Sequence, residues 1–354
     1  MPLLKKSVSD LLDFLRLVCY HNYMVTIYDI SRESGFAPGT VSKALNNYYG
    51  VNTATKKKIL ETARQMGYTP NANARALKAK HSHNLGVLFY LRDSLDLSQH
   101  FFIQILNEFK HITELRGYDI TLLSKGQDLG SQAFVKHCRI RQLDGVVIFG
   151  DYSSDLVQEL MASDIPCVGF DYIGDLISGV MCDNYEKTKE LVAKLIEMGH
   201  ERILFLTGED NYVTEERQRG YADAFRQAGK DRLPCVRASY SNPDLCFEMT
   251  QKLYPQYKPT AILYPDDYSA IGGINALHKL GLSIPDDVSV ASFDGSIFSQ
   301  LTNPPLTCVC QDAKQIALAL ADKLLRAIED DDTANEQITV EAAIRFTDSC
   351  KAIK

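Results

Sequence analysis

The segment TIYDISRESGFAPGTVSKALN, residues 26 to 46, has residue types that suit contact with DNA. Its second half is rich in Thr, Ser, Lys and Asn, and short polar side chains with one cation reach phosphates and base edges in a major groove without a clash. A glycine turn separates this half from a first helical stretch, which is the spacing of a helix-turn-helix. The alternative interpretation is an ordinary helical hairpin with a solvated face.

The rest of the chain shows no arrangement of residues that indicates catalysis. Asp266 and Asp267 form an acid pair, but adjacent residues at a strand end point in different directions, and no paired base or metal motif accompanies them. A glycine-rich phosphate loop, a nucleophile elbow and an HExxH motif are also missing. We therefore expect no enzyme activity, no catalytic residues and no cofactor.

The nine cysteines have no regular spacing, which argues against a secreted disulfide framework. Cys308 and Cys310 are the closest pair, but their spacing does not fit a zinc knuckle, and no second pair or histidine cluster complements them. Buried free thiols are the favoured interpretation, with a ligand or redox role as the alternative. No metal site is predicted.

Charge is distributed unevenly along the chain. Residues 1–80 contain 12 Lys and Arg against 5 Asp and Glu, a balance of +7, whereas the whole chain carries -7 and the remainder therefore carries -14. A basic arm favours contact with phosphates, and an acidic body repels DNA. The two parts are expected to face different partners.

The first residues, MPLLKKSVSD followed by LLDFLRLVCY, contain a weakly amphipathic apolar stretch. A signal peptide needs small residues at a cleavage site after the apolar run, and HNYMVT does not supply them. No apolar stretch approaches the roughly 20 residues that span a bilayer. We expect a cytoplasmic protein without a membrane partner, and a dispensable N-terminal extension over residues 1–24.

Two patterns of elements follow the extension. Residues 26 to 66 predict three short helices: Thr26 caps the first, with Asp29 completing an acidic capping box, Gly35 ends it, and Pro38 suits the first turn of the second. From His83 onward, short apolar runs alternate with amphipathic helices, which is typical of parallel βαβ units. The strand candidates are Leu85 to Leu91, Tyr118 to Leu123, Gly145 to Phe149, Cys167 to Phe170, Ile203 to Thr207, Ala261 to Tyr264, Val288 to Phe293 and Ile338 to Phe346.

The helix candidates of this second part are Phe101 to Arg116, Tyr185 to Met198, Glu215 to Ala228, Tyr268 to Leu280 and Gln311 to Ile328. These are more strand and helix candidates than one ordinary sheet with its helices contains. The pattern predicts two doubly wound α/β lobes with a ligand cleft between them, preceded by a small all-α domain.

The chain closely resembles the lac repressor (LacI/GalR) family of bacterial regulators. The resemblance begins with TIYDISRESG, GTVSKALN and VNTATKKKILETARQMGYTPNANARAL, in family order and spacing. It continues through LDGVVIFG, MCDNYEKT, EMGHERILFLTG, TAILYPDDYSAIGG, LSIPDDVSVASFDGS and NPPLTCVCQD, over most of residues 25 to 350. It implies a helix-turn-helix domain (25–69), a hinge helix and linker (70–82) and a periplasmic-binding-protein-like effector domain (83–350).

The resemblance also implies which residues contact operator DNA. Lys43 stands where many relatives have Arg, and a single ammonium cannot make the bidentate contact to guanine that a guanidinium makes. Pro38 and Gly39 offer little hydrogen bonding, so DNA shape and hinge contacts are expected to carry more of the specificity. The residues implied to bind phosphates or position the helix are Thr26, Tyr28, Thr40, Ser42 and Asn46, and those at base-reading positions are Pro38, Gly39 and Lys43.

The segment PNANARALK, residues 70 to 78, resembles the family's hinge helix, which is too short to be stable alone in water. The resemblance implies that Leu77 of each subunit wedges into the minor groove, with Arg75 and Lys78 alongside. The alternative is a flexible linker with an incidental leucine.

The residues that the resemblance places on the effector cleft suit a sugar. Aromatic faces stack on C–H surfaces, while carboxylates and a guanidinium bind hydroxyl groups. A lobe-bridging ion pair is the alternative for Arg217 and Asp294, and one of the two adjacent phenylalanines is expected in the core. The implied residues are Phe101, Phe102, Asp171, Arg217, Asp266, Asp267, Phe293, Asp294 and Gln311.

Together these observations predict a repressor of carbohydrate-utilisation genes that a sugar releases from a pseudo-palindromic operator. The alternative is a regulator of the same fold that responds to a phosphorylated partner protein or a purine-like corepressor. Only TDSCKAIK follows the last strand candidate, whereas tetrameric relatives append a leucine-rich helix, so a homodimer assembled through the effector lobes is expected.

Overall fold

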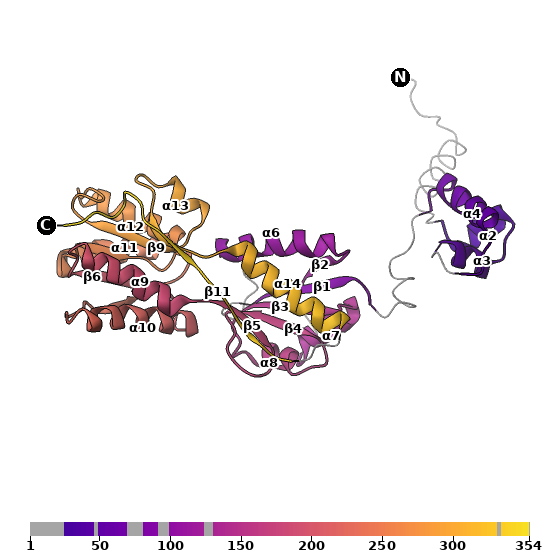
Figure 1. Cartoon of the computed structure of the whole chain (residues 1–354), viewed down its shortest axis with the longest axis horizontal. Coiled ribbons are helices and arrows are strands. Elements are labelled where there is room, and N and C mark those ends of the chain that lie inside the picture. The colour runs from indigo at the N-terminus through magenta and orange to yellow at the C-terminus, as the bar shows by residue number, and fades with distance from the viewer. Residues whose placement is uncertain are drawn as a thin grey trace, which may run out of the picture. The chain divides into compact units, whose positions relative to one another are not determined.

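The computed structural model describes residues 25–45, 49–68, 81–90, 99–123, 130–330 and 334–353. These residues belong to two compact units, one ending at Ser82 and the other beginning at His83 (Figure 1). Each unit has its own hydrophobic core.

The N-terminal unit contains the three predicted helices, α2 (Ile27–Ser34), α3 (Pro38–Leu45) and α4 (Thr53–Gln65). The Thr26 hydroxyl accepts from the backbone N–H of Asp29, whose carboxylate accepts from the Thr26 N–H, so the predicted capping box is present. Gly35 adopts a left-handed φ of 76°, which lets the chain turn from α2 into α3. A small core of Ile30, Val41, Ala44, Ile59 and Ala63 joins the three helices.

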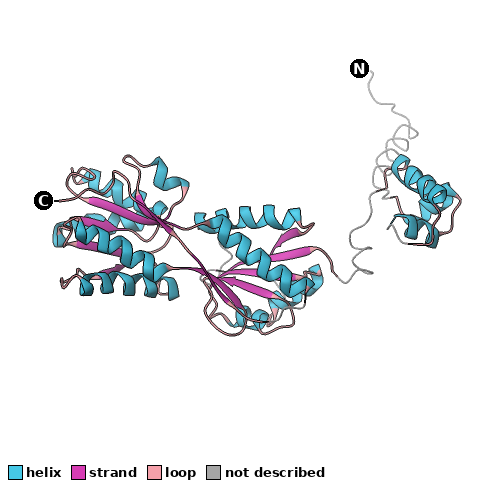
Figure 2. Cartoon of the chain, in the orientation of Figure 1, coloured by secondary structure: helices cyan, strands magenta, loops and turns pink. Residues whose placement is uncertain are grey.

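The second unit consists of two lobes, each built on a six-stranded sheet with helices on both faces (Figure 2). In the first lobe all neighbouring strands are parallel, in the order β11-β5-β4-β3-β1-β2. Its strands are β1 (Asn84–Tyr90), β2 (Asp119–Leu122), β3 (Gly145–Gly150), β4 (Cys167–Phe170), β5 (Ser178–Cys182) and β11 (Gln337–Val340). Its helices are α6 (His100–Leu115), α7 (Ala133–Arg141), α8 (Asp155–Met161) and α14 (Ala313–Glu329).

The second lobe repeats this arrangement in the order β12-β10-β9-β8-β6-β7, with β12 antiparallel to β10. Its strands are β6 (Ile203–Thr207), β7 (Cys235–Arg237), β8 (Ala261–Leu263), β9 (Ser289–Asp294), β10 (Thr307–Cys310) and β12 (Ala343–Arg345). Its helices are α9 (Asn184–Glu197), α10 (Tyr212–Gln227), α11 (Pro243–Tyr257), α12 (Asp267–Lys279) and α13 (Ile297–Leu301).

The chain passes between the lobes three times: from β5 to α9, from β10 to α14 and from β11 to β12. Figure 1 shows β11 running from the first lobe toward the second. The single last strand predicted over Ile338 to Phe346 is therefore wrong. The third crossing divides this segment into two short strands that belong to different sheets.

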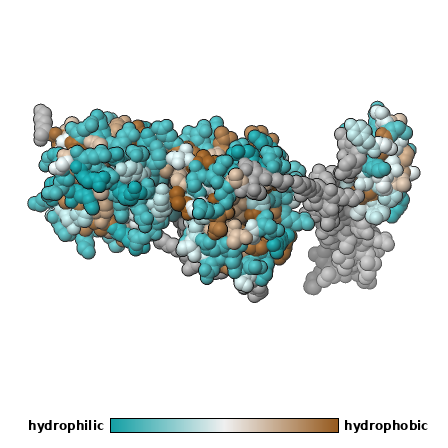
Figure 3. Space-filling model, turned by 60° about the horizontal axis from the view of Figure 1, so that its bottom comes forward, coloured by the Kyte–Doolittle hydropathy of each residue, from teal (hydrophilic) through white to brown (hydrophobic). Residues whose placement is uncertain are grey.

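The predicted two-lobed α/β fold is otherwise confirmed, and each lobe has apolar clusters on both faces of its sheet. In the first lobe, α6 and α14 cover one face while α7 and α8 cover the other. The surface of this unit that Figure 3 shows is mostly hydrophilic, with separate hydrophobic patches. Within the part of the chain that the structure describes, no helix has the length and apolar character needed to cross a membrane.

Candidate functional site

The predicted DNA-contacting residues of the helix-turn-helix are accessible to a partner. Tyr28 on α2 is 70% exposed, and Lys43 in the last turn of α3 is exposed. The Thr26 hydroxyl also donates to Asp29 at 2.6 Å, so it positions α2. The predicted residues within the described ranges, all of them exposed or half-buried, are Thr26, Tyr28, Pro38, Gly39, Thr40, Ser42 and Lys43.

The other predicted DNA contacts, Asn46, Arg75, Leu77 and Lys78, lie outside the described residues. The same holds for the N-terminal extension and for nearly all of the hinge segment. The hinge wedge therefore stays a prediction.

In the second unit, a cleft of about 720 Å³ separates the lobes. Its walls are formed by segments that follow the carboxyl ends of β3 and β4 in one lobe and of β6, β7 and β9 in the other. Ligands of open α/β sheets bind at this edge. Seven of the nine predicted effector residues line the cleft: Phe101, Phe102, Asp171, Arg217, Asp266, Asp294 and Gln311.

Arg217 on α10 is the central cation of the cleft, and only 4% of its surface is exposed. Its Nε donates to Asn184 Oδ1 at 2.8 Å, and its Nη1 donates to the Pro265 carbonyl at 2.9 Å. The guanidinium carbon lies 3.9 Å from the centre of the Phe293 ring. These contacts hold the guanidinium in one orientation, with Nη2 making no hydrogen bond to another described residue.

The alternative role predicted for Arg217 and Asp294, a lobe-bridging ion pair, is not seen among the described residues. Among the described residues, no carboxylate lies within ion-pair distance of the guanidinium. Arg217 is nevertheless close enough to lower the pKa values of Asp171, Asp266 and Asp294 partly, against the larger effect of burial. One guanidinium thus lies among three carboxylates contributed by both lobes.

Asp294 ends β9 with a φ of 100°, a conformation that non-glycine residues rarely adopt. Its Oδ1 accepts from the Gln311 side-chain amide at 2.9 Å. Burial and the neighbouring Asp267 and Asp266 carboxylates raise the pKa of Asp294 well above its ordinary value. The second lobe therefore holds this carboxyl group in a fixed place at the cleft.

The side chains of Asp266 and Asp267 point in different directions, as predicted for adjacent residues at a strand end, and they have different contacts. Asp266 lines the cleft and caps α12, accepting from the backbone N–H of Ser269 at 2.7 Å. Asp267 is fully buried behind it and accepts from Ser292 and from Ser296. Burial raises the pKa of Asp267 to about 6.

Two predicted positions on the cleft wall therefore need correction: Asp267 and Phe293 lie beneath the wall. Asp267 holds the β9–α13 loop in place, because its Oδ2 accepts hydrogen bonds from both the backbone N–H and the hydroxyl of Ser296. Phe293 is 1% exposed and is covered by the Arg217 guanidinium. Both residues support cleft residues instead of facing a ligand.

Asp171 is the acidic residue that the first lobe contributes to the predicted effector residues on the cleft. It follows β4 with a left-handed φ of 57°, and its Oδ1 is shielded from solvent and has no hydrogen-bond partner among the described residues. Burial raises the pKa of Asp171 to about 7, although Arg217 opposes this effect. Buried polar atoms are normally hydrogen-bonded, so this oxygen is a candidate ligand contact.

The two adjacent phenylalanines at the start of α6 differ in burial. Phe101 is 6% exposed and belongs to the core of the first lobe, whereas Phe102 is half-buried and packs against that core. The Phe102 ring lies edge-on to Phe170 with centroids 5.8 Å apart. Both line the cleft, and together with Tyr152 and Tyr172 they make the first-lobe wall largely aromatic.

Motif matching missed several residues of the cleft. Tyr240 lies against Arg217 and shares a hydrogen bond with Thr214. His100 of the first lobe packs edge-on against Tyr268 and Phe298 of the second, with centroids 4.7 and 4.8 Å apart. His100 directly precedes the predicted Phe101, and Tyr268 directly follows the predicted Asp267, so adjacency was an available signal for these two residues. Tyr240 and Phe298 are next to no predicted strand or site residue.

Comparison with known proteins agrees with these features. Residues 26–71 match the bacterial regulatory proteins of the lacI family, and residues 192–350 match the periplasmic binding protein-like domain. The chain is 31% identical over 341 residues to the "Probable HTH-type transcriptional repressor ExuR" of Bacillus subtilis, a match that covers 93% of this chain and 99% of that protein.

Two solved structures share the fold. The lac repressor dimer bound to operator and the anti-inducer ONPF has a TM-score of 0.82 at 23% identity, covering 93% of this chain and 100% of that one. The complex of the transcriptional regulator CelR with cellobiose has a TM-score of 0.69 at 20% identity, covering 92% and 99%. With the full-length match at 31% identity, these findings confirm the predicted family: the chain belongs to the lacI family of bacterial regulatory proteins and is a DNA-binding transcriptional regulator, not an enzyme.

Proposed function

We propose that this regulator is a cytoplasmic repressor of carbohydrate-utilisation genes whose affinity for a pseudo-palindromic operator falls when a sugar fills the cleft. The observation that carries the proposal is that the cleft combines aromatic faces with oriented polar groups. The first lobe presents aromatic faces, and the second presents Arg217, Asp266 and Asp294 in fixed positions. A polyhydroxylated ring has C–H faces for the former and hydroxyl groups for the latter.

The charge of the cleft favours an uncharged ligand. Its lining includes the carboxylic acids of Asp151, Asp171, Glu209, Asp266 and Asp294, against few cations. Arg237, one of those cations, is paired with Asp210 at the rim. A neutral sugar brings hydroxyl groups that donate to these oxygens, whereas a phosphate or carboxylate has few cations to bind it in this lining. Cellobiose in the CelR complex is a neutral ligand in a protein of the same fold.

The effector acts by favouring one arrangement of the lobes. Asp171 belongs to the first lobe, whereas Arg217 and Asp294 belong to the second, so a ligand that contacts all three binds best at one lobe separation. Only this difference in affinity between arrangements shifts the equilibrium that operator binding depends on.

We further propose that two copies assemble through the effector lobes. Helix α13 exposes Ile297 and Leu301, one helical turn apart, with exposed fractions of 52% and 73%. An apolar pair of this kind is suited to a two-fold contact with the same helix of a second copy. Two-fold symmetry would place two helix-turn-helix units on two half-sites, which is why a pseudo-palindromic operator is expected.

A thermal-shift screen of the full chain against neutral mono- and disaccharides, sugar phosphates, hexuronates and purines tests the effector class. A ligand that binds the native state increases the free energy of unfolding, by about 2.7 kcal/mol when its concentration is a hundred times Kd. The melting temperature rises as a result. We expect neutral saccharides to give the largest shift. A purine or a sugar phosphate that shifts the transition while neutral saccharides do not would overturn the proposal.

A further inference from the structure

Two cysteine sulfurs meet outside the cleft, at the end of β10. The Sγ atoms of Cys308 and Cys310 lie 3.4 Å apart, because residues two apart on a strand project from the same face. An Nη2 atom of Arg345, on the paired strand β12, lies 3.2 Å from the Cys308 sulfur and donates toward it. Two thiols beside a guanidinium are an arrangement that stabilises a thiolate.

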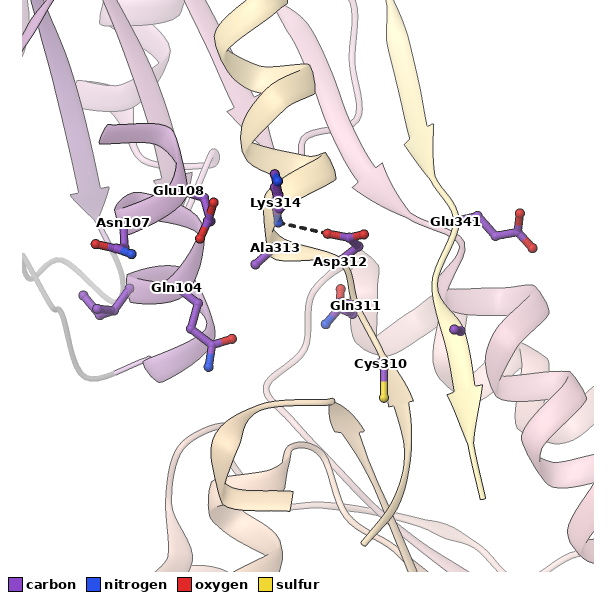
Figure 4. A pocket seen from close by; sticks show the side chains of 11 residues that line it. Gln104, Asn107, Glu108, Cys310, Gln311, Asp312, Ala313, Lys314 and Glu341 are labelled. Carbon is purple, nitrogen blue, oxygen red and sulfur yellow. Dashed lines mark hydrogen bonds between the residues drawn. The ribbon is translucent and has the colours of Figure 1, made fainter. Parts of the chain in front are cut away.

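The pair has a route to solvent. Cys308 is fully buried, but Cys310 is half-buried and lines a second cavity of about 660 Å³ between α6 and the β10–α14 crossing. Figure 4 shows the Cys310 side chain in this cavity, next to Gln311 in the chain. A small reagent can therefore reach one sulfur of the pair without unfolding the lobe.

Cys310 differs from the other described cysteines in acidity. The hydrogen bond shared with Cys308, helped by the positive charge of Arg345, lowers the pKa of Cys310 to about 7 against the effect of burial. Burial instead raises the pKa of the thiols of Cys138, Cys167, Cys182, Cys235, Cys246 and Cys350.

We propose that Cys308 and Cys310 form a peroxide-sensitive redox site, with Cys310 as the attacking thiol and Cys308 as the resolving thiol. The Cys310 thiolate attacks one oxygen of hydrogen peroxide, the O–O bond breaks, and a sulfenic acid forms while the departing oxygen leaves as water. The Cys308 sulfur then attacks the Cys310 sulfur and displaces the second oxygen as water. In the balance, two thiols and one peroxide give one disulfide and two waters.

The disulfide would be easily reduced. Residues two apart on a strand have Cα atoms about 6.6 Å apart, near the upper limit for a disulfide, and the sulfurs must approach to about 2.05 Å. The strand end must therefore bend, and strained disulfides are the labile ones. The site is thus suited to reversible regulation and not to permanent stabilisation.

Oxidation of Cys308 and Cys310 would also change the effector cleft, so this site would add redox control to the proposed function. Gly295 packs so closely on Cys310 that a Cβ on the glycine would lie 2.6 Å from the Cys310 Cβ. Gln311, the next residue, donates to Asp294 from its side chain and from its backbone. Bending the end of β10 should therefore displace the loop that carries Asp294.

The test treats the reduced full chain with one equivalent of hydrogen peroxide at neutral pH, alkylates it after denaturation and digests it with trypsin. Residues 280–314 form one tryptic peptide that contains both cysteines, so an internal disulfide appears as the loss of both alkyl groups. We expect this loss to be reversed by dithiothreitol. A peptide that stays fully alkylated would overturn the proposal without any variant.

Matched variants separate the two roles. Cys308→Ser should stop the reaction at a sulfenic acid on Cys310 that dimedone traps, whereas Cys310→Ser should remove the fast reaction. Cys235 is the control within the same chain, since it is also half-buried but burial raises its pKa to about 11. Native-state alkylation at pH 7 should be faster at Cys310 by about fiftyfold, after the lower nucleophilicity of the more acidic thiolate is counted. Equal rates would contradict the assignment.

Hydrogen exchange tests the link to the cleft. Peptides that contain residues 294–296 and 310–312 should exchange faster in the oxidised protein, while peptides from α10 should not change. Unchanged exchange at 294–296 in a protein whose disulfide has formed would overturn the link to the cleft.

Discussion

The ends of β4 and β9 occupy corresponding places in the two lobes, and both carry the dipeptide Phe-Asp. In each lobe the aspartate adopts a left-handed backbone that turns its carboxyl group toward the cleft. Their surroundings differ: Asp294 accepts a hydrogen bond from Gln311, whereas the shielded Oδ1 of Asp171 has no partner in the part of the chain that the structure describes.

The phenylalanines show the same contrast. Phe293 is covered by the Arg217 guanidinium, so its ring serves as a platform for a charged group. Phe170 packs against other aromatic rings and lines the cleft directly. The second lobe therefore holds its polar groups in place by hydrogen bonds within the protein, while Asp171 of the first lobe has an oxygen to which, in the proposed function, the ligand donates. Because the hydrogen bonds of the two aspartates differ in this way, we expect a ligand to change the arrangement of the two lobes.

Replacing Arg217 by Lys should have the largest effect on this comparison. Lysine keeps the charge but cannot bond Asn184 and Pro265 simultaneously in the fixed plane that the guanidinium provides. Loss of an oriented charge-assisted contact costs about 2 to 3 kcal/mol, so effector affinity should fall about thirtyfold to 150-fold. Operator binding without effector should stay close to wild type, as measured by fluorescence anisotropy.

Arg219→Lys is the matched control for Arg217, because Arg219 lies on the same helix but pairs with Glu216 on the surface. It should bind effector as wild type does. If Arg217→Lys weakened operator binding and effector binding together, the guanidinium would be a support of the fold and not a ligand contact.

Asp171→Asn should change how stability depends on pH. Between about pH 4 and 7 the unfolded chain loses the Asp171 proton while the folded protein, in which burial raises the pKa of Asp171 to about 7, still keeps it. The folded state then binds more protons, so wild-type stability falls as the pH rises through this window. Asparagine removes the titration, so the variant should melt higher than wild type by a few degrees at pH 8 and by less at pH 5.

Melting curves at pH 5, 6, 7 and 8 check this difference. Asp164→Asn is the control, since Asp164 is an exposed partner of Arg139. The raised pKa values of Asp266, Asp267 and Asp294 remain in both proteins and largely cancel in the difference. A melting-temperature difference independent of pH would mean that Asp171 is already ionised in the folded protein.

The sequence predicts the Phe-Asp pairs but not their unequal surroundings. Family motifs place Asp171, Arg217 and Asp294 on the cleft because backbone position alone determines where they lie. Whether Asp267 or Phe293 faces the cleft depends on neighbours distant in sequence, Ser296 and Arg217, that cover them. Such coverage is a tertiary property that spacing cannot reveal.

The missed strands have a similar explanation. β5, with sequence SGVMC, and β10, with TCVC, are too short and mixed in composition to stand out as apolar runs. The interruption between β11 and β12 is a crossing between lobes, and a crossing has no turn signature of its own. Strand order and crossings are therefore known only from the structure.

Phe102→Leu tests the aromatic wall of the first lobe, and its effect should be the smallest. Phe102 is half-buried and lies edge-on to Phe170, so leucine keeps most of the apolar contact with the core while removing a flat face from the cleft. An aromatic contact contributes about 0.5 to 1.5 kcal/mol in addition to the burial of apolar surface. Effector affinity should therefore fall about threefold to tenfold, with little change in melting temperature. Phe101→Leu is the matched comparison: Phe101 is 6% exposed within the core, so the same substitution there should lower the melting temperature more and effector affinity less. Isothermal titration and melting curves on both variants measure the two effects separately. If the two variants lost the same affinity and the same stability, Phe102 would be a core residue like Phe101 and would not supply an aromatic face to the ligand.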